Sequence, residues 1–197
     1  MWLEYISFLW MGVEVLGSIG VGVLVGSLAL IAFGGDSLVE LLSAFVVACH
    51  LKGDIAGSER LGEGVSRFGS GLLFLLLPII GFGALYSYLA GVRPEGSPLG
   101  ILIAVGAVIV MPYLWLEKRK VGQETNCLPL KIDAVESATC FFMSLSLLVG
   151  LLAEYFFGWW WADYLAAGVI LVFVAKEAIE AYHETCVGAE FSPRTDL

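Results

Sequence analysis

The chain contains six separate apolar segments, each about as long as a lipid bilayer is thick. A membrane-spanning helix needs about 20 mainly apolar residues. The segments run roughly over residues 3–25, 28–51, 68–90, 99–116, 129–157 and 161–181. Hydrophobic residues make up 59% of the chain and charged residues only 15%, so a single soluble core could not bury this much apolar surface. The sequence therefore predicts an all-α membrane protein with six transmembrane helices.

The positions of the basic residues predict how these helices are oriented. If the helices alternate in direction, nine of the ten Lys and Arg residues fall on one side of the membrane, and only Arg93 falls on the other. The nine are Lys52, Arg60, Arg67, Lys118, Arg119, Lys120, Lys131, Lys176 and Arg194. Cytoplasmic loops carry an excess of Lys and Arg. We therefore expect a multi-pass protein of the plasma (inner) membrane with both termini in the cytoplasm. Residues 1–182 would form the six-helix transmembrane domain, and residues 183–197 a short cytoplasmic tail.

Charge and motif content exclude several classes of function. The formal net charge is −9, and there is no basic patch that could neutralise the phosphates of a nucleic acid. The four cysteines have neither a CxxC spacing nor the density of a disulfide scaffold, so we expect free thiols. There is no HExxH motif or nucleophile–base pair, and both histidines, His50 and His183, lie outside the cluster described next. We therefore do not expect an enzyme.

Acidic residues interrupt the predicted helices close to the membrane midplane. An ionised side chain there costs about 2.5–3.5 kcal/mol on insertion scales. The helical rise of about 1.5 Å per residue places Asp36 about 14 Å from one membrane face, and Glu136 and Cys140 about 10 and 16 Å from the other. Asp36 and Glu40 are four residues apart, as are Glu136 and Cys140, so the two side chains of each pair project from the same helix face. Both pairs would meet near the middle of a hydrocarbon core of about 30 Å.

Three carboxylates and a thiol form a suitable tetrahedral ligand set for a divalent transition metal. We predict a metal site made of Asp36, Glu40, Glu136 and Cys140, with Glu14 and Asp133 as accessory acids. Clustered carboxylates repel one another and retain protons when no cation is present, so metal binding would displace protons. A buried acid can also be a protonated, hydrogen-bonded packing residue, which is an equal alternative for Glu14, and Asp133 can simply be interfacial.

Two further acids lie near the other ends of the fifth and sixth helices. We expect Glu154 and Asp163 to be solvated or to cap helices, because they lie close to the predicted membrane surface.

Several stretches resemble the transmembrane domain of the cation diffusion facilitator, or cation efflux, family. Residues 26–40 are similar to the start of the family's second helix, where two ligands lie four residues apart. Residues 131–140 are similar to its fifth helix, and residues 159–163 and 176–181 resemble the two ends of its sixth helix. The resemblance covers nearly the whole chain. It implies Asp36 and Glu40 as ligands, with Glu136 where the family usually has His and Cys140 where it usually has Asp.

This resemblance implies a secondary transporter that exports a divalent metal cation from the cytoplasm in exchange for protons, often as a homodimer. We expect no permanently bound cofactor. Zinc is the first choice of substrate, while cadmium, manganese, cobalt, nickel and iron remain open. A membrane metal-binding, sensor or accessory protein that does not transport is the alternative. The chain departs from the family in having no histidine in the site, and we expect a divergent branch that lacks the usual cytoplasmic C-terminal domain.

Overall fold

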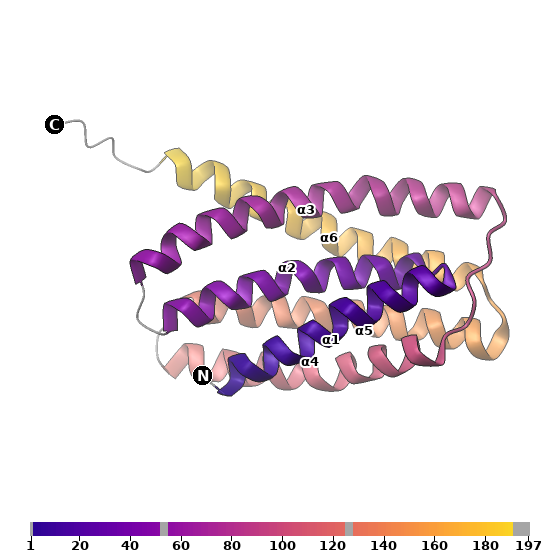
Figure 1. Ribbon diagram of the computed structural model, residues 1–197, viewed down its shortest axis with the longest axis horizontal. Helices are drawn as coiled ribbons and strands as arrows, with labels where there is room; N and C mark the ends of the chain where they lie inside the picture. Colours follow the sequence, from indigo (N-terminus) through magenta and orange to yellow (C-terminus); the bar gives the residue numbers. More distant parts are fainter. Residues whose placement is uncertain (1, 52–54, 125–127, 191–197) are drawn as a thin grey trace.

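The computed structural model is a bundle of long α-helices. It describes the backbone of residues 2–51, 55–124 and 128–190, and the side chains of residues 5–42, 44–45, 71–124 and 133–180. The helices are α1 (Trp2–Val25), α2 (Leu28–Leu51), α3 (Ile55–Leu89), α4 (Pro98–Glu124), α5 (Leu128–Phe157) and α6 (Trp161–Glu190). They lie side by side, and the start of α1 and the end of α6 lie at the same end of the bundle (Figure 1).

Two of the breaks between helices depend on glycine. Gly26, after α1, and Gly158, after α5, have φ angles of 72° and 67°, a left-handed conformation that residues with a Cβ rarely adopt. The Ser27 N–H donates to the Gly22 carbonyl at 3.0 Å, and the Gly158 N–H donates to the Glu154 carbonyl at 2.8 Å. These bonds satisfy carbonyls that the end of a helix leaves free. Both helix ends lie at the predicted positions.

Three helices are longer than predicted. α3 begins at Ile55 rather than at residue 68, α4 ends at Glu124 rather than at 116, and α6 ends at Glu190 rather than at 181. The prediction follows hydropathy, which marks the apolar part of a helix and not the polar turns that continue it. Residues 118–120, expected in a loop, therefore belong to α4.

The outer surface of the bundle is apolar. Large side chains such as Leu16 on α1, Leu102 on α4 and Val172 on α6 are exposed. Among the described residues, four stretches are long and apolar enough to cross a membrane, namely Tyr5–Val25, Gly71–Leu89, Pro98–Glu124 and Asp133–Phe157. A soluble protein rarely exposes apolar surface this extensively. The chain is therefore an all-helical membrane protein, as predicted.

α2 is the central helix, and it contacts α1, α3, α5 and α6. Glycines allow α1 to come close to it: a Cβ atom on Gly34 would lie 2.7 Å from Ile19 Cγ1, and one on Gly22 would lie 2.9 Å from Ile31 Cγ1. Small residues permit this kind of close helix packing in membranes. The packing brings residues of α1 against α2 at the level of the acidic cluster.

Candidate metal-binding site

Polar side chains gather inside the bundle, in surroundings that are otherwise apolar. The buried members come from α1, α2, α4 and α5, and they are Glu14, Asp36, Ser37, Glu40, Lys118, Asp133, Ser137 and Cys140. Two half-buried acids, Glu136 on α5 and Glu177 on α6, adjoin them. Ionisable residues placed inside a membrane protein are costly and usually functional.

Hydrogen bonds join α2 to α5 at Glu40. The Ser137 hydroxyl donates to Glu40 Oε1 at 3.2 Å, and the Cys140 thiol is in hydrogen-bonding contact with the same carboxylate. Asp36, one turn before Glu40, interacts electrostatically with Glu40 and Glu136. All four predicted ligands therefore line one polar region between α2 and α5.

These side chains do not form a complete metal site in the structure. In the part of the chain that the structure describes, no three His, Cys, Asp or Glu side chains lie close enough together to hold an ion. Asp36 Oδ1, Glu40 Oε2 and Glu136 Oε2 are nevertheless buried and have no hydrogen-bond partner among the described residues. Buried polar atoms are almost always hydrogen-bonded, so these three oxygens are the atoms best suited to accept a cation. The role of the four residues as ligands stays a prediction.

Glu14, an accessory acid in the prediction, is held by its neighbours. The Trp10 indole N–H donates to Glu14 Oε1 at 2.5 Å, and the Ser37 hydroxyl lies 3.4 Å from Glu14 Oε2. Glu14 is fully buried and interacts electrostatically with Glu40. Because both of its oxygens have partners, Glu14 fits the packing alternative better than it fits a ligand.

Asp133, the other accessory acid, forms a buried ion pair that the sequence pattern does not predict. Lys118 Nζ lies 2.9 Å from Asp133 Oδ2 and 3.0 Å from Asp133 Oδ1. The two side chains are 0% and 1% exposed. Lys118 also donates to the Ser137 hydroxyl at 3.1 Å. Asp133 is therefore neutralised by the protein itself, and the expectation that Lys118 lies in a cytoplasmic loop is wrong.

The helical periodicity of α4 could have revealed Lys118. The buried positions of this helix recur every three or four residues, and they are Gly100, Ala104, Ala107, Met111, Leu114, Lys118 and Gly122. Continuing that stripe past residue 116, where the apolar run ends, places Lys118 on the buried face.

Glu177 on α6 is a second residue outside the predicted ligand set. Its carboxyl group is in hydrogen-bonding contact with the Asp36 carboxyl group, and it interacts electrostatically with Glu40. The sequence gives only a weak signal for Glu177. It lies three residues after Val174 and seven after Ile170, both buried, so helical spacing places it near the same face of α6. In the sequence, Glu177 contributes only to the family resemblance at the end of the sixth helix.

Asp163 and Glu154 lie at the other end of the bundle, and only Asp163 has hydrogen-bond partners among the described residues. Asp163 accepts the Ser27 hydroxyl at 2.5 Å and the Leu28 N–H at 3.1 Å. It therefore caps the start of α2 from α6, and the capping role is confirmed. Glu154 is 6% exposed, and neither of its carboxyl oxygens has a hydrogen-bond partner in the described region. The expectation of a solvated Glu154 is wrong, because the packed bundle buries its side chain.

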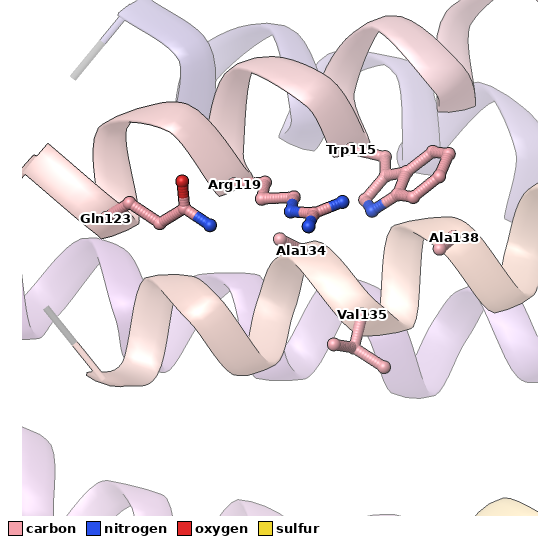
Figure 2. Close-up of a pocket in the computed structure, with 6 residues that line it drawn as sticks. All are labelled: Trp115, Arg119, Gln123, Ala134, Val135 and Ala138. Atoms are coloured by element: carbon pink, nitrogen blue, oxygen red, sulfur yellow. The ribbon is translucent and has the colours of Figure 1, made fainter.

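A cavity of about 530 Å³ lies elsewhere, between α4 and α5. Trp115, Arg119 and Gln123 line it from α4, and Figure 2 shows the Arg119 guanidinium group pointing along the helix toward the Trp115 ring. None of the predicted ligands lines this cavity, so it is separate from the acidic cluster.

Buried carboxylates on facing helices of a membrane bundle are typical of membrane proteins with an ion, proton or substrate pathway. The family model of the cation efflux transmembrane domain matches residues 5–186, and the chain therefore belongs to the cation efflux family. This is a family of transporters and not of enzymes, and the resemblance found in the sequence is confirmed. The chain is similar to the cation-efflux pump FieF of Shewanella oneidensis, with 26% identity over 168 residues. The match covers 79% of this chain and 55% of that protein, so the chain spans about half the length of its curated relative.

Proposed function

We propose that the chain exports a divalent metal cation, with zinc as the first choice, from the cytoplasm across the plasma membrane in exchange for protons. Asp36, Glu40, Glu136 and Cys140 would bind the ion in transit. The observation that carries this proposal is the set of buried carboxylate oxygens on α2 and α5 that have no hydrogen-bond partner among the described residues. In a family of cation transporters, the substrate is the natural partner for such atoms.

The ligand chemistry supports a transition metal. Zinc accepts carboxylate oxygens at about 2.0–2.2 Å and thiolate sulfur at about 2.3 Å in four-coordinate sites. Glu40 and Cys140 already interact across the α2–α5 interface. The remaining carboxylates would have to close around the ion by changes of side-chain rotamer. The thiol favours zinc and cadmium over harder ions.

The contacts around the site also support exchange for protons. Two carboxyl groups can share a hydrogen bond only when one of them is protonated, and Asp36 and Glu177 make such a contact. The Cys140 thiol must likewise lose its proton to ligate a metal. A metal ion that enters would displace these protons, and protons that return would release the metal.

Transport can be measured with purified protein in proteoliposomes. We expect flux of zinc, and of cadmium to a lesser extent, when a pH gradient is imposed, and no flux for the double variant Asp36→Asn/Glu136→Gln. The variant Glu180→Gln, which changes an exposed acid on α6, should transport like the wild type. Flux of no metal tested would refute the proposal. Tight metal binding without flux would favour the sensor or accessory protein instead.

A further inference from the structure

α6 contributes a carboxylate to the acidic cluster that the paired spacings on α2 and α5 do not reveal. Glu177 is in hydrogen-bonding contact with Asp36 and interacts electrostatically with Glu40 and Glu136. We propose that Glu177 is a fifth ligand of the transported ion, which makes the metal site a three-helix site. This inference rests on the proposed function and adds a residue to it.

The contact between Glu177 and Asp36 is compatible with shared metal binding. Two oxygens joined by a strong O–H···O bond lie about 2.5–2.7 Å apart. Two oxygens bound to one metal ion at about 2.0–2.2 Å are separated by about 3.0–3.5 Å. Two carboxyl groups that share a proton therefore need to separate by only about 1 Å or less to hold an ion between them, which a small change of side-chain torsion provides.

The neighbouring residues on α6 show that the inward position of Glu177 is specific. Lys176 and Glu180 are 68% and 62% exposed, and they face one another at 3.7 Å on the surface of the helix. Glu177 lies between them in the sequence but is half-buried, and it interacts with Asp36 and Glu40 of α2. An acid needed only for solubility or helix stability would lie on the outer face with Lys176.

The negative charge of the cluster can be compensated by bound protons or by a divalent cation. Asp36, Glu40, Glu136 and Glu177 supply four carboxyl groups. Lys118 is the buried cation nearest to them in the described region, and Asp133 engages it at 2.9 Å. A single lysine that already forms an ion pair cannot compensate the remaining acids. A divalent ion bound by Glu177 together with Asp36 would compensate the charge of the carboxyl groups that lose their protons as the ion binds.

A fifth ligand predicts how the site treats different metals. Zinc is satisfied by four ligands, whereas manganese favours a larger number of oxygen ligands. Loss of the Glu177 carboxylate should therefore weaken manganese binding more than zinc binding. Cobalt reports the ligand number directly, because its visible absorption is weak at high coordination number and becomes intense when the site is tetrahedral.

The test compares Glu177→Gln with Glu180→Gln in the full chain, purified in detergent. For Glu177→Gln we expect manganese affinity to fall at least about tenfold, zinc affinity to fall less, and the visible absorption of bound cobalt to become more intense. Glu180→Gln should behave as the wild type in all three measurements. If Glu177→Gln is poorly folded, Glu177→Asp keeps the carboxylate and should retain the weak cobalt absorption of the wild type.

The failure of this inference differs from the failure of the proposed function. If Glu177→Gln binds each metal as Glu180→Gln does, while Asp36→Asn/Glu136→Gln loses binding, then Glu177 is not a ligand and the proposed site stands. If the double variant also binds metal as the wild type does, the proposed site itself is wrong.

Discussion

The buried ion pair between Lys118 and Asp133 gives the sharpest prediction about stability. Removal of one partner from a buried pair leaves an uncompensated charge and costs about 3–5 kcal/mol. Both side chains here are almost completely buried, and the Nζ–Oδ distances are 2.9 and 3.0 Å. Lys118→Met should therefore lower the free energy of unfolding by about 3–5 kcal/mol, and Asp133→Leu should have a similar effect.

The double variant Lys118→Met/Asp133→Leu removes both charges together. Replacement of a buried pair by apolar residues of similar volume is often neutral or stabilising, so the double variant should be more stable than either single variant. Residues in direct contact usually have coupling free energies of about 0.5–3 kcal/mol. The coupling free energy between positions 118 and 133 should lie at or above the upper end of that range. Equilibrium unfolding in mixed detergent micelles, followed by tryptophan fluorescence, measures all four proteins of the cycle.

Lys120→Met is the matched control for this cycle. Lys120 lies on the same helix but is exposed, and an exposed substitution of this kind usually changes stability by less than about 0.5 kcal/mol. Equal stability of Lys118→Met and Lys120→Met would refute the buried pair. So would a double variant whose loss of stability equals the sum of the two single losses.

Three other substitutions test the packing around the site, each by its unfolding midpoint in detergent. Asp163→Ala removes the hydrogen bonds that Asp163 accepts from Ser27 and Leu28 at the start of α2, while the bond from the Leu30 N–H to Ser27 remains, and it should destabilise the protein by about 0.5–2 kcal/mol; an unchanged midpoint would contradict the capping role. Glu154→Met removes a buried carboxyl group that has no hydrogen-bond partner in the described region and should stabilise the protein by about 1–3 kcal/mol. A lower unfolding midpoint would contradict the unpaired burial of Glu154. Gly34→Ala places a Cβ atom 2.7 Å from Ile19 and should cost about 1–3 kcal/mol, whereas Gly20→Ala, with nothing within 4 Å, should not.

The sequence is sufficient to predict the helices because bilayer thickness imposes a length on every apolar segment. α2 has the predicted bounds, and the breaks at Gly26 and Gly158 follow from the conformational freedom of glycine. The four-residue spacing of Asp36 and Glu40 is enough to place both side chains on one face of α2. These properties are local, so a single sequence determines them.

The remainder of the site depends on contacts between helices that are distant in the sequence. Hydropathy alone predicts Lys118 in a loop, because a positive charge is the usual signal of a cytoplasmic segment. The periodicity of α4 places Lys118 on the buried face, but its partner Asp133 lies on another helix and is not revealed by that periodicity. Glu177 joins the cluster because α6 packs against α2, which its position near the end of an apolar run does not reveal. Tertiary packing overrides the local signal in both cases.

In the proposed mechanism, the buried acids of α2 and α5 exchange protons for a divalent metal ion. The most direct test is calorimetric titration of zinc into the purified wild-type protein and into Asp36→Asn/Glu136→Gln, in buffers of different ionisation enthalpy. We expect the wild type to bind zinc and to release protons as it does so, and the double variant to lose both effects. Zinc binding that persists in the double variant, or that releases no protons, would contradict this mechanism.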